Sequence, residues 1–138
     1  MATSGEFMLA LEIPAAAEYR TLPVAAGLSA MSEESAGKGL PASWCAVCIR
    51  NGRELIGMGR VVGDGCCFFL VVDIAVALAW QGQGLGKRIM AALTEQLHAH
   101  APAGAMIGLF ADGQAYRLYQ QFGFRLTAPG AQGMLLRL

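Results

Sequence analysis

The most constraining feature of the sequence is a strand-like run that leads into a glycine-rich turn, a helix and a second strand-like run. CCFFLVVDIAVAL (66–78) is apolar and rich in β-branched residues, as is typical of a buried strand, and AMIGLF (105–110) is a second such run. Between them, apolar residues at every fourth position predict one face of a helix: Leu85, Ile89, Leu93 and Leu97, with Met90 beside them. We expect the strand, helix and strand to form a right-handed crossover, which makes the two runs parallel neighbours.

Two further strand-like runs precede this crossover and predict an antiparallel meander. WCAVCIR (44–50) and ELIGMGRVV (54–62) are separated by Asn51-Gly52, and Asp64-Gly65 follows the second run. Such dipeptides tolerate the positive φ angles of tight hairpin turns. FMLALEI (7–13) is expected to be the first strand.

Two short helices are expected after the first strand. Pro14 opens an alanine-rich stretch in which Tyr19, Leu22 and Ala26 suit one helical face. Ser32 is expected to cap a second helix through SEESAGKG.

The C-terminal part of the chain predicts a helix and a hairpin. DGQAYRLYQQF (112–122) indicates a short helix begun by Asp112. FRLTAPGAQGMLLRL (124–138) indicates a final hairpin that turns at Pro129-Gly130.

The composition predicts one domain, residues 1–138. The chain is 55% hydrophobic and 14% charged, which supplies a core and argues against disorder. The formal net charge is +0, so the sequence lacks the cationic field that dominates nucleic-acid binding, and we expect no nucleic-acid partner. No membrane span is expected, because the longest apolar run is short and contains Asp73. The start of the chain has no basic segment typical of a signal peptide, so we expect a cytoplasmic location.

The four cysteines predict reduced thiols and no metal site. Cys45 and Cys48 form one C-x-x-C, but a zinc ribbon needs a second such pair, and Cys66 and Cys67 are adjacent. On a strand, Cys45 and Cys48 would point to opposite faces. We therefore expect packed, reduced thiols and no metal cofactor.

AWQGQGLGKRIM (79–90) places three glycines at the start of the predicted helix. Main-chain N–H groups at a helix N-terminus are unpaired and favour diphosphate oxygens, and Lys87 and Arg88 add cations nearby. A P-loop is excluded, because Gln81 replaces its first glycine and Arg88 replaces its hydroxyl residue. The spacing G-x-G-x-G also fails the dinucleotide fingerprint G-x-G-x-x-G, and a turn without chemistry is the other interpretation.

Two motifs resemble the acetyl-CoA signature of the GNAT superfamily of N-acetyltransferases. Gln81, Gly84 and Gly86 match the pattern Q-x-x-G-x-G, and LYQQFGF (118–124) resembles the F/L-Y-x-x-x-G-F segment of the family. The order of predicted elements is similar to the family's fold over nearly the whole chain. The resemblance implies an α/β fold of the α+β type: a mixed, mostly antiparallel sheet with one central parallel strand pair, flanked by about four helices.

The resemblance also implies a site for acetyl-CoA as cosubstrate. Main-chain groups of Ile74, Ala75 and Val76 would pair with the pantetheine arm where the parallel strands part. Asp112 stands where many members have an asparagine that touches the cofactor, and a role as N-cap is the alternative. Main-chain amides of the turn would hold the diphosphate: Gln81, Gly82, Gln83, Gly84, Leu85, Gly86 and Lys87.

The implied reaction is direct transfer of the acetyl group to an amine. A backbone N–H near Val76 would donate to the thioester oxygen, and Tyr119 would be the general acid for the leaving sulfur. Asp73 is the nearest acidic candidate for the base or for a substrate anchor. A structural pair with Arg60 or another cation, and deprotonation through water, are the alternatives.

The acceptor is expected to be a small primary amine, because the chain is short and neutral overall. Residues 27–44 would wall its site. Acetylation of a protein N-terminus or lysine, and a regulatory module that binds coenzyme A without catalysis, are the alternatives. For GMLLRL (133–138), two interpretations stay open: pairing in a homodimer, and simple burial.

Overall fold

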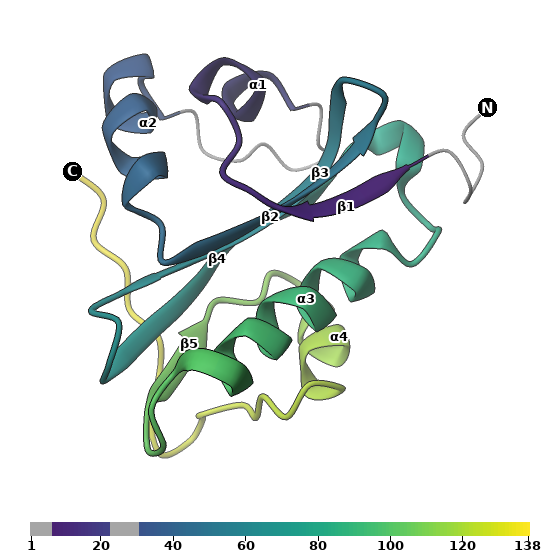
Figure 1. Ribbon diagram of the computed structural model, residues 1–138. Helices are drawn as coiled ribbons and strands as arrows, with labels where there is room; N and C mark the ends of the chain where they lie inside the picture. The colour runs from purple at the N-terminus through teal and green to yellow at the C-terminus, as the bar shows by residue number, and fades with distance from the viewer. Residues whose placement is uncertain (1–6, 23–30) are drawn as a thin grey trace.

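The computed structural model describes residues 7–22 and 31–138, which form a five-stranded sheet covered by helices on both faces (Figure 1). The strands, in the order in which they lie in the sheet, are β1 (Met8–Leu11), β2 (Cys45–Asn51), β3 (Glu54–Gly63), β4 (Phe68–Val76) and β5 (Met106–Leu109). The helices are α1 (Ala16–Thr21), α2 (Glu33–Gly39), α3 (Leu85–His100) and α4 (Tyr116–Gln120), with short 3-10 turns η1 (Leu40–Ala42) and η2 (Leu78–Trp80). This mixed, mostly antiparallel architecture confirms the predicted fold class. The parallel pair, β4 and β5, was expected at the centre of the sheet, but it lies at the edge of the sheet that the described residues form, because β5 is the last strand in the order.

Strands β1 to β4 form the predicted antiparallel meander. The hairpins close at Gly52 and Gly65, which have φ angles of 60° and 84°. At the second hairpin, Oδ1 of Asp64 accepts from the N–H groups of residues 66–68 at 2.7–3.2 Å. These bonds lower the pKa of the Asp64 carboxyl and fix the bend from which β4 starts.

The crossover through α3 makes β4 and β5 parallel, as predicted. Their pairing is short, and runs from Phe68 opposite Met106 to Val71 opposite Leu109. β4 continues to Val76 with β3 as its partner, so residues 72–76 have no ladder on the β5 side among the described strands. The parallel pair therefore parts half-way along β4.

One extra residue interrupts the ladder between β3 and β4. Arg60 pairs with Val72 and Met58 pairs with Ala75, so the intervening residue of β3 faces two residues of β4, 73 and 74. Asp73 has a φ angle of 57°, in the left-handed region that residues other than glycine rarely adopt. This arrangement is a β-bulge.

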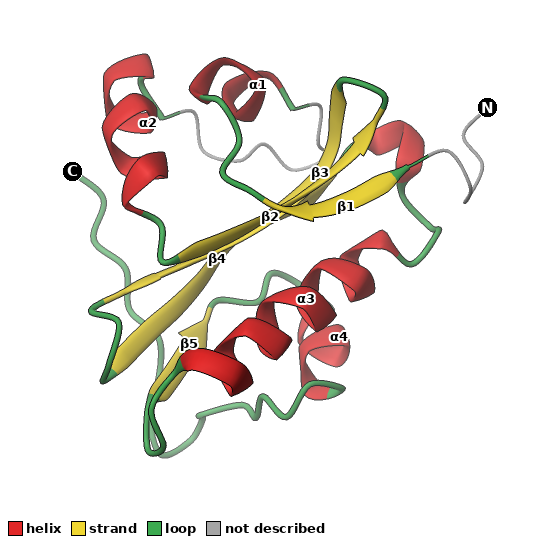
Figure 2. Ribbon diagram, in the orientation of Figure 1, coloured by secondary structure: helices red, strands yellow, loops and turns green. Residues whose placement is uncertain are grey.

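The core lies on both faces of the sheet. On one face, α3 buries its predicted apolar side, including Ile89, Met90 and Leu93, which are completely inaccessible. Helix α4 lies on the same face, and α1 and α2 cover the other (Figures 1 and 2). Gly59 permits close packing of β3, because a Cβ built on it would lie 2.6 Å from both Ile74 Cδ1 and Ile89 Cγ2.

Helices α1 and α2 form where the sequence predicts them. Tyr19 and Leu22 are buried, and Ala26 lies outside the described residues. The Ser32 hydroxyl caps α2 by accepting from the Ser35 N–H at 3.0 Å.

An arginine of β2 fastens α1 to the sheet. The Arg50 guanidinium pairs with the carboxylates of Glu18 and Glu12, at 2.7 Å each. The hydrogen bond from Arg50 lowers the pKa of the Glu18 carboxyl. The carboxylates of Glu12 and Glu18 are therefore engaged in ion pairs within the protein.

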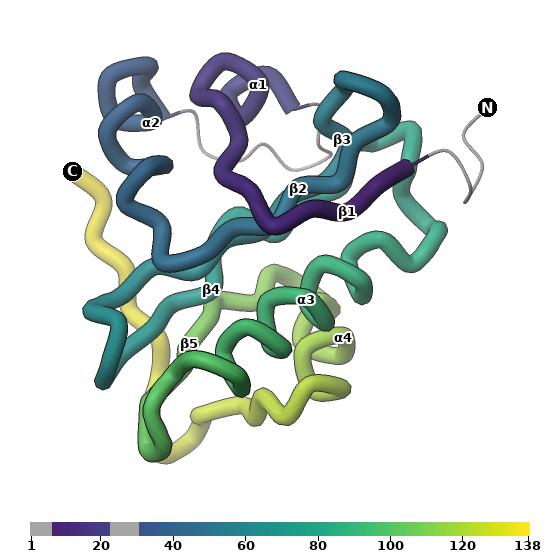
Figure 3. Tube along the Cα trace, in the orientation of Figure 1, coloured from purple at the N-terminus to yellow at the C-terminus, as the bar shows by residue number. Residues whose placement is uncertain are grey.

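The predicted final hairpin is wrong, because residues 121–138 contain no strand (Figure 2). Figure 3 shows the path of this segment from α4 to the C-terminus. The run MLL places three apolar residues in succession and lacks the alternation that would bury one face of a strand. Met134, Leu135 and Leu136 are 80–90% exposed, so burial of this segment is wrong as well. Gly133 instead lies against the ring of Phe110, just beyond β5.

Helix α4 begins at Tyr116 and not at Asp112, so the predicted start is wrong. Gly113 adopts a φ angle of 54°, and the Ala115 N–H donates to the Asp112 carbonyl oxygen at 3.0 Å. A turn thus occupies residues 112–115. Ala115 is the N-cap, and no side chain caps this helix.

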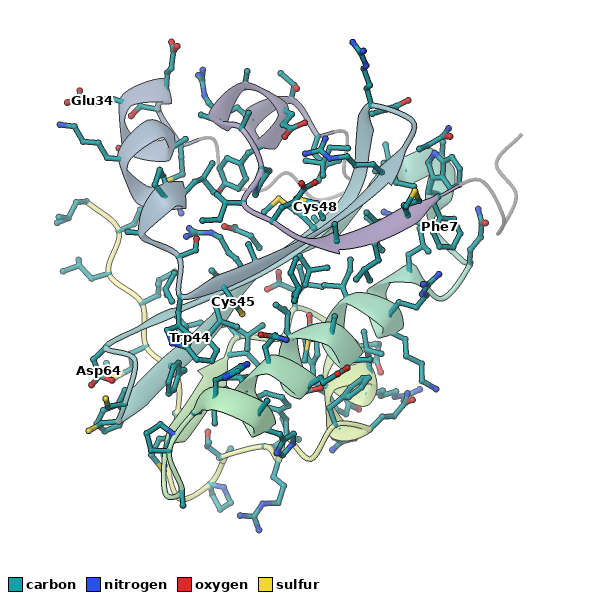
Figure 4. The ribbon with its side chains drawn as sticks, in the orientation of Figure 1. Phe7, Glu34, Trp44, Cys45, Cys48 and Asp64 are labelled. Atoms are coloured by element: carbon teal, nitrogen blue, oxygen red, sulfur yellow. The ribbon has the colours of Figure 1, made fainter. Side chains whose placement is uncertain are left out.

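The cysteines are free thiols, and Cys45 and Cys48 lie on opposite faces of β2, as predicted (Figure 4). Cys48 is buried, and its thiol donates to the Glu12 carbonyl oxygen at 3.4 Å. Burial raises the pKa of this thiol to about 12. Cys66 and Cys67 are exposed in the bend before β4, so the expectation of packed thiols is wrong for this pair.

The described ranges, residues 7–22 and 31–138, contain neither a membrane-spanning helix nor a cluster of metal-binding side chains. No helix in these ranges has the length and apolarity needed to cross a membrane. No group of three or more His, Cys, Asp or Glu residues in them could hold a metal ion.

We expect Gly59→Ala to lower the free energy of unfolding by about 1–3 kcal/mol, because the added methyl group overpacks the contact of β3 with Ile74 and Ile89. Urea unfolding measures this change. Gly37→Ala in α2 is the matched control, because a Cβ there meets no atom within 4 Å and alanine favours a helix. Equal stability of the two variants would contradict the packing described for β3.

Candidate active site

The glycine-rich turn connects η2 to α3 and leaves its main chain open. Gly82 and Gly84 have φ angles of 82° and 80°, which glycine adopts without strain. Gly84 is the N-cap of α3, and no side chain caps this helix. A Cβ built on either glycine would meet no atom within 4 Å among the described residues. The space beside the turn is therefore open to a ligand.

The first turn of α3 presents N–H groups to this space. The Arg88 N–H makes the first helical bond, to the Gly84 carbonyl oxygen at 3.2 Å. The N–H groups of Leu85, Gly86 and Lys87 precede that bond and have no helical acceptor. This turn also has no acidic residue. With the helix dipole, these groups favour an anion such as a diphosphate.

The two cations after the glycines differ in their surroundings. The Arg88 guanidinium lies over the ring of Phe7, 4.9 Å from its centroid, and that ring packs edge-on against Trp80 (Figure 4). Lys87 and Gln83 are exposed. Lys87 makes no ion pair within the described ranges, so it is the cation that a bound anion can recruit without displacing another contact.

Val76 directs both of its main-chain polar groups into the gap beside β5. The Ala77 N–H donates to the Ile56 carbonyl oxygen at 2.7 Å, which makes Val76 and Gly57 a non-hydrogen-bonded pair of the β3–β4 ladder. In such a pair, the N–H and C=O groups point away from the partner strand. The gap therefore contains polar main chain without a strand partner.

The three residues expected to contact pantetheine are not equivalent. Ala75 is the hydrogen-bonded partner of Met58, so β3 uses its N–H and C=O groups. Ala75 therefore has a strand partner that Val76 lacks, and its predicted contact with pantetheine stays untested. Ile74 lies within the bulge, and its role and that of Val76 stay predictions.

Gln81 links the turn to β4 through its side chain. Its Nε2 donates to the Val76 carbonyl oxygen at 3.0 Å. The Val76 N–H is then the group that is left for a ligand. The sequence indicated a main-chain role for Gln81, and this side-chain contact was not predicted, because it depends on how the turn folds back on β4.

Helix α4 packs on the first turn of α3 through Leu118. A Cβ built on Gly86 would lie 3.6 Å from Leu118 Cδ2, so this glycine allows α4 to pack closely. The next residue, Tyr119, lines a cavity of about 540 Å³ between β5, α4 and the C-terminal segment. Burial, and then the charge of the exposed Asp112, raise the pKa of the Tyr119 phenol. The hydroxyl is therefore a proton donor at neutral pH.

Asp73 contacts two groups from neighbouring elements. Its Oδ2 accepts from Arg60 Nε at 2.7 Å and from the Tyr19 hydroxyl at 3.2 Å. The pair with Arg60 is the structural alternative that the sequence left open. Tyr19 is 54 residues away in the chain, and only the tertiary structure shows its contact with Asp73.

The residues present fit acetyl-CoA, the cosubstrate that the motifs imply. The open turn at Gly84 suits the diphosphate, and the Val76 N–H, which has no strand partner, suits a carbonyl group of an extended arm. Leu118, next to Tyr119, packs on Gly86 of the same turn. The two sequence motifs therefore meet in space.

Known proteins resemble this chain in sequence. GCN5-related N-acetyltransferase 2, chloroplastic, of Arabidopsis thaliana is 37% identical over 82 residues, which cover 59% of this chain and 31% of that protein. The chain spans about a third of the length of the curated relatives that it matches.

Solved structures share the fold. A protein of unknown function from meticillin-resistant Staphylococcus aureus, described as a probable acetyltransferase, is 37% identical with a TM-score of 0.89, over 96% of this chain and 99% of that chain. A GNAT family acetyltransferase from Brucella melitensis in complex with acetyl-CoA has the same fold at 20% identity, with a TM-score of 0.62 over 87% of this chain and 83% of that chain.

The model of the acetyltransferase (GNAT) domain matches residues 41–126, a range that is more than half of the chain and contains the bulge, the glycine-rich turn and Tyr119. The chain therefore belongs to the GNAT family of acetyl-CoA-dependent acetyltransferases.

Proposed function

We propose that this protein is an N-acetyltransferase that moves the acetyl group of acetyl-CoA to a primary amine. One observation carries the proposal: the open N-terminus of α3 adjoins the end of β4, where the Val76 N–H has no strand partner and the Gln81 side chain binds the Val76 carbonyl oxygen. A tight turn without chemistry would account for the glycines, but not for polar main chain left exposed beside β5.

The cosubstrate would be held largely by main chain. N–H groups of residues 81–87 bind the diphosphate, and Lys87 adds a positive charge. Ile74 and Val76 pair with the amide groups of the pantetheine arm. Acetyl-CoA supplies the acetyl group as a thioester, which an amine attacks directly.

Two groups of this chain would assist the reaction. The Val76 N–H donates to the oxygen on which negative charge develops, and a fixed donor of this kind needs no reorganisation. The Tyr119 hydroxyl gives a proton to the departing sulfur. Because burial raises the pKa of Tyr119, the phenol is protonated at neutral pH and can donate when the carbon–sulfur bond breaks.

Removal of the amine proton would proceed through water. Asp73, the acidic candidate from sequence, already accepts from Arg60 and Tyr19 through one carboxylate oxygen. We therefore assign Asp73 a positioning role and leave the amine proton to solvent.

The acceptor would be a small primary amine and not a basic protein tail. Glu12 and Glu18 are paired with Arg50, and Asp73 is paired with Arg60. These three ion pairs offset most of the negative charge of the carboxylates near α1, which could otherwise attract a run of cations. A small amine needs one pocket and no extended acidic surface.

Tyr119→Phe is expected to lower turnover at least tenfold, with little change in the KM for acetyl-CoA, because the phenol acts on the leaving sulfur and not in cofactor binding. Steady-state kinetics with release of free thiol measures both constants. Tyr116→Phe, which removes a phenol from the same helix, is the matched control and should keep turnover within about twofold. Unchanged turnover of Tyr119→Phe would remove this residue from the mechanism.

An acceptor panel tests the substrate class. We expect kcat/KM for polyamines or arylalkylamines to exceed that for lysine-containing or free N-terminal peptides by at least about tenfold. The N-acetylated form of each amine is its matched control and should release no thiol above background. Preference for peptides would indicate a protein acceptor. Binding of acetyl-CoA with no amine-dependent thiol release would indicate a regulatory module.

A further inference from the structure

A cluster of four polar side chains, the Asp73 cluster, joins four segments on the α1 side of the sheet. Oδ2 of Asp73 in β4 accepts from Nε of Arg60 in β3 at 2.7 Å and from the hydroxyl of Tyr19 in α1 at 3.2 Å. Nη1 of Arg60 also donates to Oγ of Ser43, which precedes β2, at 3.1 Å. None of these contacts is local in sequence.

The backbone at Asp73 needs this support. A φ of 57° is ordinary for glycine in a β-bulge, but in an L-residue it brings Cβ into steric conflict with the backbone. Aspartate tolerates the left-handed region better than most residues. A glycine would remove the penalty and the carboxylate together, so the aspartate is useful only if its side chain holds something in place.

The Asp73 cluster is shielded from water. Tyr19 is 5% exposed, and the side chains of Arg60 and Asp73 are each 16% exposed. Burial, followed by the negative charge of Asp73, raises the pKa of the Tyr19 phenol, so its hydroxyl stays a donor at neutral pH. Loss of one partner would leave another polar group buried without its hydrogen bond.

The bulge determines which way the main chain of Val76 points. Before the bulge, Val72 pairs with Arg60, and after it Ala75 pairs with Met58. Without the extra residue, the alternation along β4 would be displaced by one position. Val76 would then turn its N–H toward β3 and away from the gap.

We propose that the Asp73 cluster is a positioning device that holds the bulge of β4 and thereby aims the Val76 N–H into the gap beside β5. Asp73 acts in it as a positioning residue through Arg60 and Tyr19, and not as the base that accepts the proton of the amine. This inference rests on the proposed function, because the gap is where the acetyl-pantetheine arm would bind.

The first test separates the arm from the diphosphate. Tyr19→Phe removes one hydroxyl from the cluster and leaves the turn at Gly84 untouched. We expect coenzyme A to bind about three- to tenfold more weakly, as loss of one hydrogen bond predicts, whereas ADP 3′-phosphate, which lacks pantetheine, binds as to wild type. Calorimetric titration measures both, and Tyr116→Phe is the matched control with neither affinity changed.

If Tyr19 only stabilised the fold, Tyr19→Phe would lower the thermal midpoint and leave the ratio of the affinities for coenzyme A and ADP 3′-phosphate unchanged. That result would overturn this inference and leave the proposed function standing. If the wild-type protein bound neither ligand, the proposed function would fail, and the inference with it. The two failures are therefore distinguishable.

The second test separates positioning from base catalysis at Asp73. Asparagine keeps the left-handed preference and a side-chain acceptor, so Asp73→Asn should retain turnover within about threefold and keep the shape of the pH–rate profile. Asp73→Ala loses both and should lower kcat/KM at least tenfold. A loss of about 10²–10⁴ in Asp73→Asn, with the acidic limb of the profile removed, would identify Asp73 as the base and overturn the inference.

Discussion

The ladder between β3 and β4 is the interaction on which the rest of the structure depends. The pairing of β4 with β5 ends at Val71, whereas its pairing with β3 continues to Val76. Strand β3 therefore holds the end of β4 in place by itself among the described strands. The ladder ends with the hydrogen bond from the Ala77 N–H to the Ile56 carbonyl oxygen. Because of this bond, the N–H and C=O groups of Val76 point away from β3. A sheet that normally satisfies its own main chain thus leaves a short stretch for a ligand.

Three glycines allow the surrounding elements to approach this stretch. Gly59 lets α3 pack directly on β3. Gly84 is the N-cap of α3 and leaves the helix N-terminus without a side chain. Gly86 lets Leu118 of α4 contact the first turn of α3. As a result, α4 packs on the helix N-terminus that follows the end of β4, although these segments are distant in sequence. Each glycine is explained by its place in this arrangement.

The sequence predicted the regular parts of the fold well, because their signals are local. Apolar spacing identified α3, the Asn51-Gly52 and Asp64-Gly65 dipeptides identified the hairpins, and the crossover rule identified the parallel pair. The prediction of a C-terminal hairpin was wrong, because a turn signal at Pro129-Gly130 does not show whether the flanking residues pair as strands.

The site was predictable only in part for the same reason. The turn at residues 81–87 was recognisable from its motif, because the pattern lies within a few consecutive residues, whereas the side-chain bond from Gln81 to Val76 was not predicted. The separation of Ala75 from Val76 depends on the register with β3, and the bond of Tyr19 to Asp73 depends on how α1 packs on the sheet. A single sequence contains no local signal for either.

The central claim is that the glycine-rich turn and the end of β4 bind one ligand together. Titration of the isotopically labelled protein with coenzyme A, followed through its amide resonances, tests this claim most directly. The account predicts saturable binding with shifts concentrated at Gly82, Gly84 and Val76. Absence of binding, or shifts confined to the other end of α3 near Leu97 and His98, would contradict it.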